Sequence, residues 1–455
     1  LSILLSLLVP AHGTRSPDCG GILTPAGLGY CKSRPRIPDL AAGRGGGGSF
    51  LWARDCTPAR AALPTPSFCS SRNQITSVNV TELSLSLVPH TGLRLSIDAD
   101  LGVTPAPSTT KVMRLSLLAE LHVEMNPEGN LELVTSACKP SVEEVQSTEE
   151  MERGHPMPAD PRVHLPPLSL FSIPQICLEV SKLLLLPNEQ LVSLTAPFPV
   201  TPSCQLQYLP LAAPVFSEQG ITISLQTTFQ VLGMAIPLPI SPVPFSMPEL
   251  ASSSPSHLTL AFSEHFYTSL FFALEMAGAF NMTVQSPLTT TTMAQKVTQI
   301  RSLFPEEQPL VLQAVFRSSP RVQLEEGRAA LKLFLTVHIG TGSPAFQSFL
   351  SVNVDLSAGL LLGVADTRMT ISAAGIEDAE LSLAASDVGP VPAALLEELF
   401  LPTVREEVPA QINEVLSEGV GLPHISSFTY RDVDVVVHKD YVLVPCTLQL
   451  RARMG

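Results

Sequence analysis

The residue types that perform catalysis are present in this chain, but their spacing matches no catalytic or metal-binding motif. Its 455 residues include ten histidines, none of which stands in an HExxH or HxH arrangement suited to zinc. The sequence also lacks a GxSxG motif, a phosphate-binding loop and a dinucleotide-binding fingerprint. We therefore expect a protein that is not an enzyme and that has no metal site and no cofactor.

Some carboxylates do lie beside a histidine or a second carboxylate, as acid/base groups do in many active sites. Glu264 and His265 open an expected helix, and the pairs Glu397–Glu398 and Glu406–Glu407 lie on another. None of these groups has the spacing of a metal-ligand set. We expect the paired carboxylates to face solvent, and His265 to be solvated or to cap its helix.

Cysteine and asparagine side chains offer covalent chemistry of a different kind. The triplets that start at Asn79 and Asn281 are N-glycosylation sequons, which are modified in secreted proteins. Asn281 follows an expected helix and is the better surface site, whereas Asn79 falls within an expected strand. The cysteines are Cys19, Cys31, Cys56, Cys69, Cys138, Cys177, Cys204 and Cys446.

The first residues indicate the compartment. Residues 1–13, LSILLSLLVPAHG, look like the apolar core of a secretory signal that ends in small residues, with a short buried helix as the alternative. The initiator Met and a basic region before the apolar core are absent, so we expect an incomplete start. No other stretch reaches the ~20 apolar residues of a membrane span. We expect a secreted protein, in a compartment where disulfides are stable.

Charge is distributed unevenly along the chain. The formal net charge is −14, which argues against a nucleic-acid partner because phosphate backbones are repelled. Residues 1–70 hold seven Lys and Arg against three Asp, so the remainder carries −18. Residues 14–70 also contain the single Trp and four of the cysteines, and they show no period of 2 or 3.6. We expect this segment to be irregular, as disordered or artefactual sequence, with a disulfide-stapled module as the alternative.

The rest of the chain is dominated by strict alternation of apolar and polar residues, which is typical of antiparallel sheets with one dry face. In TGLRLSIDADLGV, residues 91–103, every second side chain is apolar. The expected strands cover 75–89, 91–103, a hairpin over 113–138, 220–233, 329–340, 349–364, 368–375, 379–389 and 432–450.

Helical periodicity interrupts these strands in the second half. We expect helices over 263–280, with Ser263 as N-cap, and over 393–419, where Pro402 and Pro409 should kink or divide the helix. Residues 176–186 are a shorter candidate helix. The Pro-rich stretch 187–216 predicts a connector between two domains.

The order and spacing of these features resemble the BPI/LBP/PLUNC family of lipid-binding proteins, and most of all its long two-domain family B. The resemblance rests on SAC at 136–138, QICLEV at 175–180, the helix SEHFYTSLFFALEMAGAFNMTV and the closing strand HKDYVLVPCTLQL. It covers roughly residues 75–455. It implies a disulfide between Cys138 and Cys177, which are 39 positions apart, whereas Cys204 and Cys446 have no assigned partner.

The resemblance implies an α+β fold, an elongated boomerang of two domains in which twisted antiparallel sheets or barrels pack on long helices. The N-terminal domain would be 75–186 and incomplete, 187–216 would supply the linker and central sheet, and 217–455 would form the C-terminal domain. Each family domain can hold a phospholipid-like ligand in an apolar groove. Endotoxin-binding members of the family use a cationic N-terminal tip, whereas this chain is acidic after residue 70. We therefore do not expect it to kill bacteria by binding endotoxin.

The function that the resemblance implies is secreted binding of a phospholipid or another amphipathic lipid, with a role in innate mucosal defence. A regulatory or structural interaction protein with collapsed pockets, secreted or in the endoplasmic reticulum lumen, is the alternative. Six apolar residues are candidates to line an acyl pocket, or else to pack an ordinary core. They are Phe229, Val231, Phe266, Leu270, Leu274 and Phe334.

Overall fold

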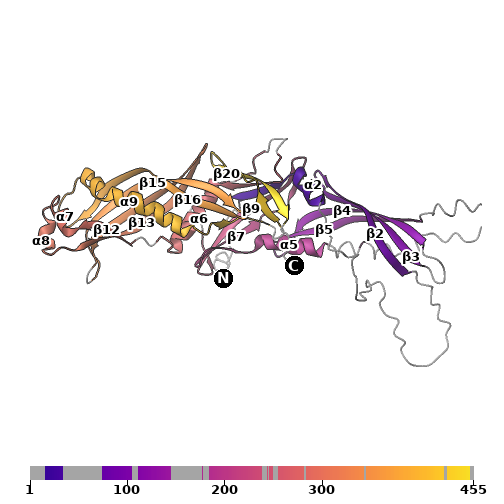
Figure 1. Cartoon of the computed structure of the whole chain (residues 1–455), viewed down its shortest axis with the longest axis horizontal. Coiled ribbons are helices and arrows are strands. Elements are labelled where there is room, and N and C mark those ends of the chain that lie inside the picture. The colour runs from indigo at the N-terminus through magenta and orange to yellow at the C-terminus, as the bar shows by residue number, and fades with distance from the viewer. Residues whose placement is uncertain are drawn as a thin grey trace, which may run out of the picture. The chain divides into compact units, whose positions relative to one another are not determined.

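A computed structural model gives the fold of the chain (Figure 1). The residues that it describes are 16–33, 74–104, 111–144, 177, 184–237, 243, 245–249, 255–280, 283–342, 345–424 and 428–450. The chain divides into two compact units. The smaller unit comprises Leu28–Val123 and Leu133–Pro187, and the larger unit comprises Leu1–Gly27, Glu124–Glu132 and Asn188–Gly455. The expected α+β class, with antiparallel sheets packed on helices, is confirmed.

A four-stranded antiparallel sheet forms most of the smaller unit. Its strands, in spatial as well as chain order, are β2 (Gln74–Val88), β3 (Gly92–Thr104), β4 (Lys111–Met125) and β5 (Leu131–Glu144). The hairpin expected within 113–138 is present, and Gly129 at its turn has a φ of +84°. The amide of Gly129 donates to the carbonyl of Asn126 over 2.9 Å, which closes the turn.

The larger unit contains a ten-stranded sheet whose main path runs β18-β20-β11-β1-β9-β7-β6. Its strands are β1 (Cys19–Leu23), β6 (Phe198–Thr201), β7 (Cys204–Pro210), β8 (Val215–Ser217), β9 (Gly220–Val231), β10 (Met234–Ala235), β11 (Leu258–Ser263), β18 (Phe428–Arg431), β19 (Val436–His438) and β20 (Tyr441–Leu450). The stretch 187–216 therefore supplies three strands of this sheet in addition to α5 (Leu185–Val192) and the short 3-10 helix η3 (Ser193–Thr195). Most of the candidate helix 176–186 lies outside the described residues.

Strand β1 corrects the expectation that residues 14–70 are irregular throughout. Cys19–Leu23 pairs antiparallel with β9 on one side and β11 on the other, and helix α2 (Pro25–Ser33) follows it. The strand is buried on both faces and includes Gly20 and Gly21, so it shows no alternation that the sequence could reveal. Residues 34–70 lie outside the described part of the chain.

A buried carboxylate precedes β1. The amide of Thr227 in β9 donates to Asp18 Oδ1 over 2.9 Å, and the Thr227 hydroxyl donates to Asp18 Oδ2. Asp18 is 1% exposed. Burial raises the pKa of this carboxyl to about 6, because removal from water disfavours its charged form, although the Thr227 hydrogen bonds oppose the shift.

The second sheet of the larger unit has six antiparallel strands in chain order. They are β12 (Thr283–Thr289), β13 (Pro309–Glu325), β14 (Arg328–Thr341), β15 (Gln347–Ala365), β16 (Arg368–Ser386) and β17 (Val420–Gly421). Strand β16 joins the two strands expected at 368–375 and 379–389. The register shifts between Ser318 and Arg321, where Pro320 cannot donate to the ladder.

Helix α6 (Glu264–Met276) contacts β9 and β11 of one sheet and β13 of the other. Ser263 caps the helix, because its hydroxyl accepts from the amide of Phe266 over 3.3 Å. Strand β12 pairs only with residues 309–313 of β13, so the rest of that edge needs other partners. Glu264 and Thr268 provide them by accepting from the amides of Leu324 and Val322 over 2.8 and 3.0 Å.

Helix α9 (Ala393–Val415) lies along the six-stranded sheet and packs on β16 (Figure 1). It continues through Pro402 and Pro409, so neither proline divides it. Near its C-terminal end, the side chain of Asn413 accepts from the amide of Ala373 and donates to its carbonyl over 2.7 and 3.3 Å. Nearer the N-terminus of α9, Glu398 forms an ion pair with Lys296. Lys296 lies between two short helices, α7 (Thr290–Ala294) and α8 (Ile300–Leu303).

Candidate functional site

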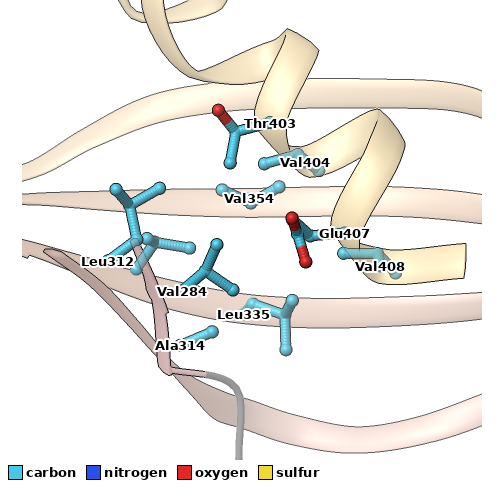
Figure 2. Close-up of a pocket in the computed structure, with 10 residues that line it drawn as sticks. Val284, Leu312, Ala314, Leu335, Val354, Thr403, Val404, Glu407 and Val408 are labelled. Carbon is cyan, nitrogen blue, oxygen red and sulfur yellow. The ribbon is translucent and has the colours of Figure 1, made fainter. Parts of the chain in front are cut away.

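An apolar pocket lies between α9 and the inner face of the six-stranded sheet (Figure 2). Its volume is about 30 Å³. The lining residues are Val284, Leu312, Ala314, Leu335, Val337, Val354, Thr403, Val404, Glu407 and Val408. The pocket as it stands can hold only one or two water-sized groups, and its walls are almost entirely hydrocarbon.

Strand pairing brings the floor of the pocket together. Leu312 and Ala314 are two positions apart on β13, and Leu335 and Val337 are two positions apart on β14, so each pair points to one face. Val284 of β12 lies opposite Leu312, and Val337 lies opposite Ala314. Val354 of β15 lies opposite Leu335. Alternation along four neighbouring strands thus produces a continuous apolar floor.

The helix supplies the roof of the pocket through one of its faces. Thr403, Val404, Glu407 and Val408 are spaced i, i+1, i+4 and i+5, which places them on one side of α9. They lie in the segment between Pro402 and Pro409. Each proline lacks the amide that would donate to the carbonyl four residues earlier, so α9 lacks the helical hydrogen bonds to the carbonyls of Glu398 and Arg405.

Glu407 is the one ionisable residue in the pocket lining. Neighbouring residues on a helix point about 100° apart, so Glu406 is exposed while the half-buried Glu407 turns toward the sheet. Figure 2 shows the Glu407 carboxylate between α9 and the strands. The prediction that both carboxylates of this pair simply face solvent is therefore wrong for Glu407. The signal in the sequence was the apolar spacing of Val404 and Val408, since Glu407 follows Val404 by three residues and so shares its side of the helix.

The groups at the start of α6 also differ from expectation. His265 is buried rather than solvated, and its Nε2 lies 3.4 Å from the Ser269 hydroxyl, one helical turn away. Burial lowers the pKa of His265 because it disfavours the charged imidazolium. Glu264 bonds to β13 and has no role in the pocket. This pair therefore joins the helix to its surroundings.

None of the six residues predicted to line an acyl pocket contributes to this one. Phe229 and Val231 are buried in β9, and Phe266, Leu270 and Leu274 are fully buried along α6. The Phe266 ring packs against Phe262 and Tyr267, with centroids 4.9 and 5.1 Å away. These five side chains fill the core around α6.

Phe334 is separated from the pocket by the sheet itself. It lies on β14 between Leu333 and Leu335, both buried, and is itself only half-buried. Because side chains alternate across a strand, Phe334 points to the face opposite the pocket-lining Leu335.

A family model places this pocket among known proteins. The model of the C-terminal domain of the LBP/BPI/CETP family matches residues 202–450, which include every residue of the pocket lining. The chain belongs to this family. The resemblance noted in the sequence is therefore confirmed.

Curated relatives and a solved structure of the LBP/BPI/CETP family extend the match to the whole chain. Protein TENP of Gallus gallus is 58% identical over 464 residues, which span 100% of both chains. Human BPI fold-containing family B member 2 is 24% identical over 463 residues, 98% of this chain and 97% of the human protein. The crystal structure of lipopolysaccharide binding protein aligns with a TM-score of 0.51 at 16% identity, over 96% of this chain and 100% of that one. That alignment shows a shared fold.

None of the cysteines or sequon asparagines singled out in the sequence lines the pocket. Cys138 of β5 and Cys177 form a disulfide in the smaller unit, with Cα atoms 5.9 Å apart. Cys19, Cys204 and Cys446 are buried free thiols of the ten-stranded sheet, and burial raises the pKa values of Cys204 and Cys446 to about 11 and about 12. Asn79 lies in β2, and Asn281 lies outside the described residues.

The described residues contain no group of three His, Cys, Asp or Glu side chains close enough to hold a metal ion. Among the helices in that part of the chain, none combines the length and apolar character needed to cross a membrane.

Proposed function

We propose that this protein binds an amphipathic lipid, with the acyl chain held between α9 and the six-stranded sheet. The observation that carries the proposal is the apolar pocket within the family-matched residues 202–450. Family membership implies lipid binding, and eight of the ten lining residues are Val, Leu or Ala. Burial of each methylene contributes about 0.8 kcal/mol, so affinity would come from chain length and the choice of lipid would be broad.

The pocket must enlarge to accept an acyl chain. Ligand pockets usually enclose roughly 300–1,000 Å³, well above the about 30 Å³ found here. The roof is the wall suited to move. Its segment lies between two prolines, and α9 is attached to its surroundings on either side, by Glu398 to Lys296 and by Asn413 to Ala373.

A first prediction concerns this movement. In a Pro402→Ala/Pro409→Ala variant, restored amides can complete the helical hydrogen bonds, so the roof should open less readily. We expect uptake of a fluorescent phosphatidylcholine to slow by about tenfold. The free-energy change behind this slowing is a part of the roughly 3 kcal/mol that each interior proline costs a helix. Stopped-flow fluorescence measures the rate. Pro392→Ala is the control, because a proline at the N-cap interrupts no helical hydrogen bond. An unchanged rate in the double variant would contradict a moving roof.

A second prediction locates the ligand. Ala314→Phe would fill the pocket from its floor, whereas Val315→Phe places the same ring on the opposite, half-exposed face of β13. We expect Ala314→Phe to weaken phosphatidylcholine binding by about tenfold or more, equivalent to losing roughly two buried methylenes. Val315→Phe should bind as the parent does. Equal affinities for the three proteins would place the lipid elsewhere.

A second candidate function follows from the small size of the pocket. So small a pocket also fits a regulatory or structural interaction protein whose lipid sites have collapsed, in the extracellular space or the endoplasmic reticulum lumen. Native mass spectrometry of the full chain from mammalian secretory cells separates the two functions. Co-purified lipid, or uptake of labelled phospholipid, supports lipid binding. The absence of both favours the interaction protein.

Secretion and glycosylation belong to the same proposal. The apolar residues 1–13, the disulfide Cys138–Cys177 and the sequons at Asn79 and Asn281 all suit a protein of the secretory pathway. A role in innate mucosal defence remains part of this proposal through the family resemblance. Neither catalysis nor a cofactor enters it.

A further inference from the structure

We propose that Glu407 makes the pocket select amphiphiles whose head group is a protonated amine over those with an anionic head group. This inference rests on the proposed lipid-binding function and adds a ligand class to it. The amine would lie beside the Glu407 carboxylate at the roof, and the hydrocarbon chain would lie along the apolar floor.

Glu407 contrasts with the rest of the pocket lining. Of the other nine residues, only Thr403 has a polar side-chain atom, and it is buried on the helix one turn before Glu407. A carboxylate that faces hydrocarbon loses part of its hydration, which is unfavourable unless a partner replaces the water. No hydrogen bond or ion pair joins Glu407 to the described residues. A head group that donates hydrogen bonds would supply that partner.

The charges around the pocket also favour a cationic head group. The cations of the neighbouring strands face away from it. Lys332 lies on β14 at a position that alternates with the inner-face Leu335, and Arg317 pairs with Asp355, the neighbour of the inner-face Val354. Lys296 is already paired with Glu398. Arg405 of α9 is exposed and lies about 200° around the helix from Glu407. An anionic head group at the roof would therefore meet Glu407 without a facing cation, whereas an ammonium group would be attracted.

Three probes with the same chain test the selectivity. Hexadecylamine, hexadecanol and hexadecanoate would each compete with a fluorescent phosphatidylcholine for the full-length protein. We expect the amine to bind about fivefold more tightly than the alcohol, which is the gain in affinity that one half-buried ion pair would provide. The carboxylate should bind more weakly than the alcohol. Glu407→Gln should bring all three affinities to within about twofold of one another.

Glu406→Gln is the matched control, since it removes the same charge from the adjacent, exposed position on α9. It should leave the preference for the amine intact, which separates a local effect of Glu407 from attraction to an acidic protein. Preference that survives in Glu407→Gln, or equal binding of the three probes by the parent protein, would overturn the inference while leaving lipid binding in place. Failure of the parent protein to bind any probe, or the labelled phospholipid, would overturn both proposals.

Discussion

Replacing Cys138 and Cys177 together by serine is expected to lower the free energy of unfolding of the smaller unit by about 4 kcal/mol. The disulfide joins positions 39 residues apart, and the chain-entropy model assigns about that value to a loop of this size. The physical reason is that the bridged unfolded chain has fewer conformations to lose on folding. The double replacement also avoids leaving one reactive thiol unpaired.

Calorimetry of the full chain under non-reducing conditions measures this loss as a lower melting temperature for one part of the transition. Cys204→Ser is the control, because Cys204 is a buried cysteine without a disulfide in the larger unit. It isolates the effect of placing a serine hydroxyl at a cysteine site. A double variant that melts at the parent temperature, or peptide mapping that finds both thiols free in the parent protein, would refute the stabilising bridge.

Ionisation of Asp18 is expected to make the protein less stable by about 3 kcal/mol as the pH rises from about 4 to neutral. The pKa of the buried carboxyl is about 6 in the folded state and 3.8 in the unfolded reference. The folded state therefore holds its proton more tightly. Stability from this group is fully present below pH 3.8, falls as the pH rises toward about 6 and is constant above it. A difference of about two pKa units corresponds to about 3 kcal/mol.

Asp18→Asn isolates this effect from the many other carboxylates. The Asn amide keeps an oxygen to accept from the Thr227 amide. Its NH₂ can donate to the Thr227 hydroxyl, which reverses the bond in which that hydroxyl donates to Asp18 Oδ2. We expect the variant to match the parent protein near pH 4 and to exceed its stability at pH 7.5. Urea unfolding at both pH values gives the difference. Asp378→Asn, at an exposed position of β16, should change neither value. A parent-to-variant difference that is independent of pH would show that Asp18 is not buried in its charged form.

The strands were predictable where each has one buried face, because alternation is a local property of the chain. Residues 91–103 predict β3, and the actual Gly92–Thr104 differs by one residue at each end. Strand β1 was missed because both of its faces are buried, and its partners β9 and β11 lie about 200 residues further along the chain. Long-range pairing supplies the stability there, and no local pattern records it.

The sequence determined the strand-rich fold, the two long helices and the family, since these depend on periodicity, capping and the order of segments. Only the tertiary structure decided which apolar stripe is core and which borders a space. Phe266 and Leu270 on α6 and Val404 and Val408 on α9 follow the same helical spacing. Helix α6 contacts two sheets, so nine of its thirteen side chains are buried, Phe266 and Leu270 among them. Helix α9 covers a single sheet, and the pocket forms where that packing is incomplete.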